Sequence, residues 1–196
     1  MKLLQDKVVL VTGASRGIGR AIATHLATHG AHIAFTYLSS VEKGEALSAE
    51  LQALGVKAKG YRSDASDFKA AEELINAVVA DFGGLDILVN NAGAAWMAEF
   101  DSFPESGWDK TVDLNMKTPF FLTQALAPQL RAAAAKNKHL AKVINIASID
   151  GVSINEMETY PYAASKAGLI HMTKRMALRL IQDDIVVTAI APGAFA

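Results

Sequence analysis

The segment KVVLVTGASRGIG at residues 7–19 decides the fold of this chain. An apolar run ends in a turn that carries Gly13, Gly17 and Gly19, and a helix-forming stretch follows. Glycines at such a turn allow a tight reversal after a strand, close approach of the backbone to a ligand, and close packing of the helix. The N-terminus of the helix also presents unpaired N–H groups to an anion. The segment therefore predicts a strand, a phosphate-binding turn and a helix.

The glycine spacing is GxxxGxG, which differs from the usual dinucleotide-binding spacing GxGxxG. The alternative is that these glycines serve turn geometry alone. Their place between a predicted strand and a predicted helix favours the nucleotide site. The residues of this turn that we expect to contact a bound dinucleotide cofactor are Gly13, Ser15, Arg16, Gly17, Ile18 and Gly19.

Short apolar runs alternate with longer helix-patterned stretches along the rest of the chain. The predicted strands are 7–12, 31–36, 56–61, 85–90, 142–147 and 185–191. The predicted helices are 17–29, 41–54, 67–82, 105–135 and 160–182, with Ser40 and Ser66 as N-caps of the second and third. The runs are nearly continuous in Val, Ile and Leu, which is typical of parallel strands covered on both faces. We expect one α/β domain over residues 1–196, a Rossmann-type doubly wound parallel sheet in three α/β/α layers.

Composition excludes several classes of protein. The 196 residues contain no cysteine, which excludes disulfides, thiolate catalysis and cysteine-based zinc sites. A net charge of −1 gives no general attraction to nucleic acid. No apolar run approaches the roughly 20 residues that span a bilayer, and Asp6 and Lys7 come too early for a signal peptide. We expect a cytoplasmic protein without a metal site, since His25 and His29 have no suitable third ligand.

The end of the second strand indicates whether a dinucleotide site would favour NAD or NADP(H). An NAD site usually places a carboxylate there, on the ribose 2′-hydroxyl, and this carboxylate would repel a 2′-phosphate. The stretch from Phe35 to Ser40 has no carboxylate, and Arg16 supplies a cation nearby. With Tyr37, Ser39 and Ser40 as further contacts, NADP(H) is favoured over NAD. The alternative for Arg16 is a solvated loop cation.

A tyrosine–lysine pair begins the last predicted helix. Tyr162 and Lys166 are four residues apart, so they share one helix face. A tyrosine hydroxyl is a poor base at neutral pH, and a neighbouring ammonium favours its phenolate form. Ser148 follows a predicted strand at the sheet edge where α/β proteins bind ligands. A tyrosine–lysine pair alone is more often a surface contact, and its combination with Ser148 and the nucleotide motifs favours a catalytic site.

Together these motifs resemble the short-chain dehydrogenase/reductase family, over essentially the whole chain. The matching motifs are TGxxxGxG at 12–19, NNAG at 90–93, the YxxxK pair at 162–166, Asp64, and Pro192-Gly193. The resemblance implies that Asp64 and Ala65 hold the adenine, and that Asn91, Ala92, Gly93, Pro192, Gly193, Tyr162 and Lys166 also contact the cofactor. It implies that Tyr162 transfers the proton, Ser148 positions the substrate oxygen, and Lys166 acts on Tyr162 and the ribose. Asn115 then holds a water molecule of the proton relay, or is a structural helix residue.

The resemblance also implies a function. It predicts an NADP(H)-dependent oxidoreductase that acts on a carbonyl or secondary alcohol, with a 3-oxoacyl thioester as one candidate. Residues up to Gly93 resemble 3-oxoacyl-[acyl-carrier-protein] reductases, and the stretch from Ala94 resembles other members. The alternative is a catalytically weak NADP-binding sensor or scaffold.

Assembly and the end of the chain complete the expectations from the resemblance. The helices at 105–135 and 160–182 pair between subunits in the family, so a homodimer or homotetramer is expected. The family continues past Pro192-Gly193, so we expect a fold C-terminally short of the usual last helix and strand, with an exposed sheet edge beside 185–191. Trp96 and Met97 either line a substrate pocket or pack between helices.

Overall fold

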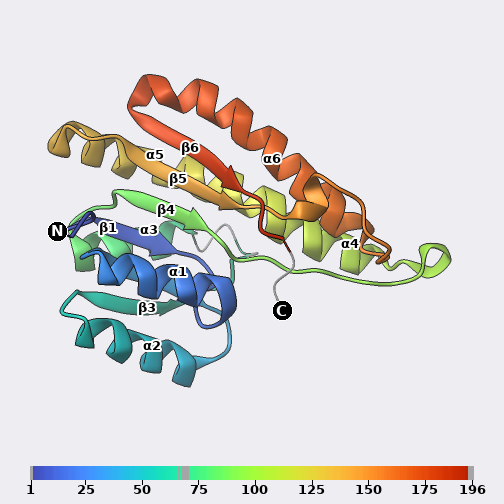
Figure 1. Cartoon of the computed structure of the whole chain (residues 1–196), viewed down its shortest axis with the longest axis horizontal. Helices are drawn as coiled ribbons and strands as arrows, with labels where there is room; N and C mark the ends of the chain where they lie inside the picture. The colour runs from blue at the N-terminus through green and yellow to red at the C-terminus, as the bar shows by residue number, and fades with distance from the viewer. Residues whose placement is uncertain (1, 66, 68–70, 194–196) are drawn as a thin grey trace.

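The computed structural model describes residues 2–65, 67 and 71–193. Its centre is a six-stranded sheet in the order β3-β2-β1-β4-β5-β6, with every neighbouring pair parallel (Figure 1). The strands are β1 (Val8–Val11), β2 (His32–Tyr37), β3 (Ala58–Arg62), β4 (Ile87–Asn90), β5 (Ala141–Ile146) and β6 (Ile185–Ile190). All six predicted strands are therefore confirmed, and no strand end is shifted by more than two residues.

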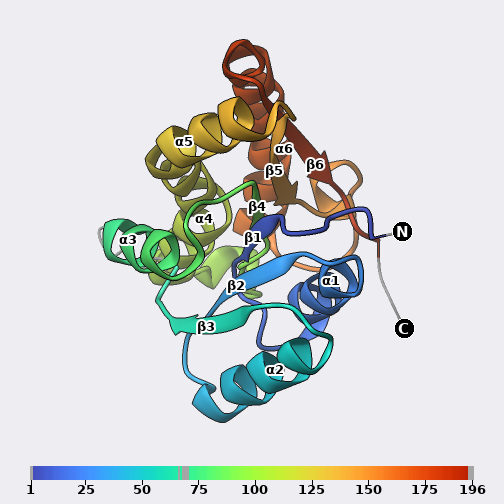
Figure 2. The same ribbon diagram turned by 90° about the vertical axis from the view of Figure 1, so that its left-hand side faces the viewer.

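Helices cover both faces of the sheet (Figure 2). They are α1 (Gly17–Thr28), α2 (Val41–Ala53), α3 (Ala71–Phe82), α4 (Glu105–Val112), α5 (Thr118–Asn137) and α6 (Tyr160–Leu180). Helices α1 and α2 pack on one face, and α3, α5 and α6 pack on the other. The predicted three-layer Rossmann-type arrangement is confirmed.

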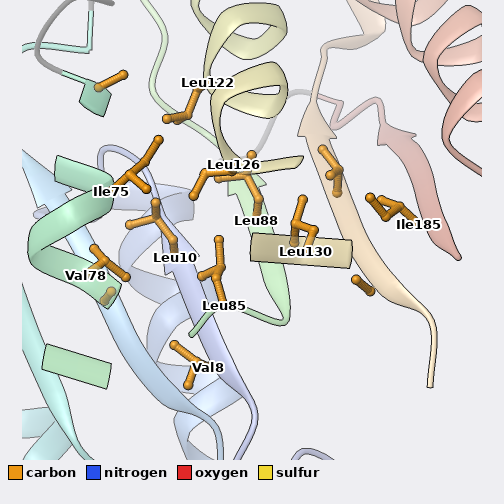
Figure 3. Close-up of a cluster of buried hydrophobic side chains, with 14 of the residues drawn as sticks. Val8, Leu10, Ile75, Val78, Leu85, Leu88, Leu122, Leu126, Leu130 and Ile185 are labelled. Carbon is orange, nitrogen blue, oxygen red and sulfur yellow. The ribbon is translucent and has the colours of Figure 1, made fainter. Parts of the chain in front are cut away.

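The core is divided by the sheet into two apolar layers. Val8 and Leu10 of β1 face α3 and α5, whereas Val9 and Val11 face α1 and α2. Figure 3 shows the first of these layers, in which Leu126 of α5 lies over the strands. Because side chains alternate between the faces of a strand, burial on both faces requires the continuous apolar runs seen in the sequence.

The predicted helix 105–135 is wrong as a single α-helix. A π-helical turn at Asp113–Lys117 separates α4 from α5. Pro119 has no N–H to donate to the carbonyl of Asn115, four residues earlier. In addition, the Thr118 hydroxyl donates to the Asp113 carbonyl at 3.0 Å and to the Ala65 carbonyl at 2.6 Å. These features accompany the wider helical turn, which has Asn115 at its centre.

Other sequence expectations have mixed outcomes. Ser40 occupies the N-cap position of α2, as predicted, but its side chain makes no capping hydrogen bond. Ser66 lies outside the described residues.

The rings of His25 and His29 lie 4.9 Å apart, and the described residues contain no group of three potential metal ligands. No helix within the described ranges is long and apolar enough to cross a membrane.

Strand β6 is the outermost strand beside β5 in the described part of the chain. On the α1 side of β4, β5 and β6 lies an apolar groove of about 730 Å³. Its lining is Gly17, Ile18, Ala21, Ile22, His25, Leu26, Val89, Ile144, Ile146 and Ile190. Helices therefore cover the α1 side of β4, β5 and β6 less completely than the opposite side of the sheet.

Candidate active site

The glycine-rich turn after β1 is tied to the turn after β4. The Thr12 hydroxyl oxygen accepts hydrogen bonds from the backbone N–H groups of Asn91 at 3.0 Å and Ala92 at 2.9 Å. In return, Asn91 Nδ2 donates to the carbonyl oxygens of Thr12 at 2.9 Å and Gly13 at 3.0 Å. These four bonds fix the two turns relative to each other at the carboxyl edge of the sheet.

Each glycine in the turn after β1 is needed for a different physical reason. Gly13 adopts a φ of 67°, which favours glycine, and its N–H donates to the Thr36 hydroxyl at 3.1 Å. Gly17 has a φ of 57°, and a Cβ built on it would meet nothing within 4 Å, so its backbone is open to a ligand. A Cβ on Gly19 would lie 2.4 Å from Asn91 Nδ2 and 2.6 Å from the Gly13 carbonyl oxygen. Helix α1 therefore begins in direct contact with both turns.

A cleft of about 370 Å³ opens over these turns. Its lining includes twelve of the residues expected to bind the cofactor: Gly13, Ser15, Arg16, Gly17, Ile18, Gly19, Tyr37, Asp64, Ala65, Asn91, Ala92 and Gly93. Thr36, Leu38, Ser63 and Leu114 complete it. Ser39, Ser40, Tyr162, Lys166, Pro192 and Gly193 are outside this lining. The open glycine backbone, the N-terminus of α1 and the Arg16 cation fit the phosphates of a dinucleotide.

Tyr162 and Lys166 lie on the same face of α6, as the spacing predicts. Lys166 Nζ is 5.6 Å from the centre of the Tyr162 ring and donates to the Ile146 carbonyl at 2.7 Å. Lys166 is only 4% exposed, and this burial lowers the pKa of its ammonium to about 8. The residue is thus a desolvated cation beside a half-buried phenol.

Ser148 is fixed beside α6 by the turn that follows it. Its Oγ accepts from the Asp150 N–H at 3.2 Å, which leaves the hydroxyl proton to be donated elsewhere. A Cβ on Gly151 would lie 2.7 Å from the Lys166 carbonyl carbon, so this turn packs directly on α6. The Ile149 N–H donates to the Pro192 carbonyl at 2.9 Å, which joins the turn to the segment after β6.

Asn115 connects the turn after β4 with α6. Its Oδ1 accepts from the Ala94 N–H at 2.9 Å, and its Nδ2 donates to the Ala94 carbonyl at 2.8 Å and to Ser165 Oγ at 3.1 Å. A Cβ on Gly93 would lie 3.1 Å from Asn115 Oδ1 and 3.6 Å from Lys166 Nζ. The fold thus brings Gly93, Asn115 and Lys166 together, although they are far apart in the sequence.

Comparison with known proteins identifies the family. The family model for short chain dehydrogenase matches residues 7–196. The chain is a short-chain dehydrogenase/reductase. It is 39% identical over 187 residues to the 3-oxoacyl-[acyl-carrier-protein] reductase of Staphylococcus aureus, covering 95% of this chain and 74% of that protein. It is also 39% identical to the rhamnolipids biosynthesis 3-oxoacyl-[acyl-carrier-protein] reductase of Pseudomonas aeruginosa, covering 98% of this chain and 74% of the relative.

A solved structure supports the same assignment. The RhlG/NADP active-site complex of Pseudomonas aeruginosa matches with a TM-score of 0.92 and 37% identity, over 98% of this chain and 74% of that chain. Membership of this family makes the chain an oxidoreductase, and the solved relative from Pseudomonas aeruginosa binds NADP. The family resemblance inferred from the sequence motifs is confirmed.

Sequence reasoning missed several residues that shape the dehydrogenase site. Thr12, Thr36, Thr118 and Ser165 are buried hydroxyl residues whose hydrogen bonds fix the turns and helices around the cleft. Thr12 and Thr36 were detectable, since each is a polar residue at the carboxyl end of an apolar strand. Tyr160 is a competing tyrosine, but its hydroxyl donates to Glu158 at 2.9 Å, and this bond raises the pKa of Tyr160. It is therefore unsuited to proton transfer.

Burial of Lys166 predicts a pH-dependent contribution to stability. Between about pH 8 and 10.5, the folded protein has released the Lys166 proton, whereas the unfolded chain still binds it. The free energy of unfolding of the wild type, relative to Lys166→Met, is therefore expected to rise with pH across this window. Urea unfolding without cofactor is measured at about pH 7.5 and 9.5. Between these pH values, the difference in unfolding free energy between the wild type and Lys166→Met should increase by on the order of 1–2 kcal/mol. Lys174→Met, at an exposed lysine of α6, is the control, and a flat or falling Lys166 difference contradicts the prediction.

Proposed function

We propose that this short-chain dehydrogenase/reductase reduces the keto group of a 3-oxoacyl thioester to a secondary alcohol with NADPH, and prefers NADP(H) to NAD. The observation that carries the proposal is the Tyr162–Lys166 pair on α6, with the turn after Ser148 packed on the Lys166 backbone and Lys166 Nζ close to Gly93 of the cleft. We further propose that residues 1–196 act as one catalytic domain, in a cytoplasmic homodimer or homotetramer.

The bound cofactor supplies the hydride, and the residues of this chain manage the proton. The Ser148 hydroxyl donates a hydrogen bond to the substrate carbonyl oxygen and orients it, while keeping its proton. Tyr162 then donates its phenolic proton to the same oxygen as negative charge develops there. The Lys166 ammonium, held by the Ile146 carbonyl, stabilises the resulting phenolate. In the reverse direction Tyr162 is the base.

Asn115 has a positioning role in this mechanism. Its side chain is fully engaged with Ala94 and Ser165, so it orders the turn beside the nicotinamide position. Its backbone carbonyl, in contrast, receives no N–H from Pro119. We propose that this carbonyl accepts a hydrogen bond from the water molecule that returns a proton through Lys166.

We propose that four exposed apolar residues form a rim on the substrate side of the site: Met97, Val152, Ile154 and Met157. These side chains are exposed by 59–100% of their surface, and Ile154 is fully exposed. They belong to the two segments that follow Ala94 and Ser148. A hydrogen bond of 3.4 Å from the Ala98 N–H to the Glu158 carbonyl oxygen joins these segments. An apolar rim next to the reacting groups favours a substrate with an alkyl chain, as the names of both relatives suggest for those proteins.

Acyl-chain length provides the test of this function. In an assay of NADPH consumption with 3-oxoacyl N-acetylcysteamine thioesters, kcat/KM is expected to rise by about twofold per methylene beyond acetoacetyl. Full burial of one methylene contributes about 0.8 kcal/mol. A twofold effect corresponds to about half of that free energy, because a rim covers only one side of the acyl chain. Replacing Met97 and Ile154 by serine together is expected to flatten the dependence on chain length without lowering acetoacetyl turnover.

Leu3→Ser is the matched control, because Leu3 is 70% exposed and belongs to the N-terminal segment. It should leave the chain-length dependence unchanged. Equal activity on all chain lengths in the wild type would exclude the rim as an acyl-binding surface. Failure to reduce any 3-oxoacyl thioester, with turnover of other ketones, would overturn the substrate class.

The alternative function, a weak NADP-binding sensor or scaffold, is not favoured. The catalytic candidates are present and three of them are held in place by specific contacts. The relatives found are reductases by name. A sensor has no need for a buried lysine, whose desolvation costs stability, beside a tyrosine.

A further inference from the structure

The turn between β2 and α2 has a basic residue that comes from a different strand. Arg62, the last residue of β3, is paired in register with Tyr37, the last residue of β2. Its Nε donates to the carbonyl oxygen of Leu38 at 3.3 Å. Leu38 lines the cofactor cleft, so this bond brings the guanidinium to the edge of the cleft where the second strand ends.

We propose that Arg62 is a second cation for the 2′-phosphate of NADP(H) and a determinant of cofactor specificity in this chain. The inference rests on the proposed preference for NADP(H) over NAD. Arg62 acts there together with Arg16, which approaches from the glycine-rich turn.

The geometry of Arg62 leaves its charge available. Residues paired in register on neighbouring strands point to the same face of a sheet, and Tyr37 contacts Gly44 of α2. The Arg62 side chain therefore lies on the α2 face, toward the start of that helix. The bond to Leu38 uses only Nε, so both terminal nitrogens remain for an anion. Within the described residues, no other hydrogen bond or ion pair involves this guanidinium.

The neighbouring turns carry further donors without intramolecular partners among the residues that the structure describes. Ser39 and Ser40 precede the N-terminus of α2, and neither hydroxyl forms a hydrogen bond within the described residues. The side chain of Arg16 likewise makes no hydrogen bond or ion pair in the described part of the chain. The stretch from Tyr37 to Ser40 carries no carboxylate. Two guanidinium groups and two hydroxyls are the chemistry that recognises a phosphate monoester.

A competing role for Arg62 is purely structural. Its bond to Leu38 satisfies a carbonyl at the end of β2, and loss of that bond would disturb the whole adenosine end of the cleft. The two roles differ in one respect. A structural role affects every adenosine ligand equally, whereas a phosphate-binding role affects only ligands with a 2′-phosphate.

The test compares adenosine 2′,5′-bisphosphate with adenosine 5′-monophosphate by isothermal titration calorimetry on the whole chain. Arg62→Gln is expected to weaken binding of the bisphosphate by about tenfold, the value of one hydrogen bond to a charged group, about 1.5 kcal/mol. Binding of the monophosphate should change by less than about twofold, and circular dichroism should show unchanged thermal unfolding. Arg20→Gln is the matched control, because it removes one exposed arginine, paired with Glu50, on α1.

Three results would overturn the inference. An equal loss for both ligands in Arg62→Gln assigns a structural role. Unchanged affinity for both ligands shows that Arg62 does not reach the phosphate. If the wild type itself binds the two ligands equally, the proposed preference for NADP(H) is also wrong. If the wild type prefers the bisphosphate and Arg62→Gln keeps that preference, only the role of Arg62 is wrong.

Discussion

Tyr162→Phe is expected to lower kcat for carbonyl reduction by about 10²–10⁴-fold, the usual contribution of a general acid. The substitution removes the phenolic proton and keeps the ring that lies 5.6 Å from Lys166 Nζ. Ser148 and Lys166 cannot replace it, because the first orients the substrate oxygen and the second is held by the Ile146 carbonyl. Affinity for NADPH should stay within about twofold, since the cleft lining does not include Tyr162.

The measurement is NADPH oxidation at saturating acetoacetyl thioester, with NADPH affinity from fluorescence titration. Tyr160→Phe is the matched control on the same helix, two residues earlier. Its hydroxyl bonds Glu158, and its ring packs edge-to-face on Phe100 and Phe103, so kcat should be retained. Retention of more than a tenth of wild-type kcat in Tyr162→Phe, or a large loss in Tyr160→Phe, would contradict the assignment.

Gly19→Ala is expected to damage both folding and cofactor binding. The new Cβ would lie 2.4 Å from Asn91 Nδ2 and 2.6 Å from the Gly13 carbonyl oxygen, and the latter is backbone that cannot rotate away. Helix α1 must therefore move off the two turns. Overpacking of this kind lowers the free energy of unfolding by about 1–3 kcal/mol. NADPH affinity should fall at least about tenfold, because the helix N-terminus that faces the phosphates is displaced.

Gly168→Ala is the matched control for Gly19→Ala. Both glycines are within helices, but a Cβ on Gly168 would meet only the Met116 side chain, at 2.6 Å from its sulfur. A methionine side chain can adjust, so stability should change by less than about 1 kcal/mol and NADPH affinity by less than about twofold. Urea unfolding and NADPH titration measure both quantities. Wild-type affinity in Gly19→Ala would show that the contact between α1 and the turns is unimportant for binding.

The sequence alone determined the sheet and its covering helices, because both depend on local pattern. Continuous apolar runs such as residues 7–12 and 185–191 require burial on both faces, and only a parallel sheet between helix layers provides it. The glycine-rich turn and the Tyr162–Lys166 pair are also local, since each depends on spacing within a few residues. The resemblance to the family then named Ser148 and Asn115.

Only the tertiary structure decided how these local pieces meet. The bonds from Thr12 to the turn after β4 join residues that are 79 and 80 positions apart, and no periodicity encodes them. The π-helical turn at Asn115 is accompanied by Pro119 and by a bond from Thr118 to a distant partner, Ala65, so helical spacing predicted an unbroken helix there. The approach of Arg62 to Leu38 follows from strand register, which a single sequence leaves undetermined. Burial of Lys166, which lowers its pKa, likewise arises from packing of the whole chain around it.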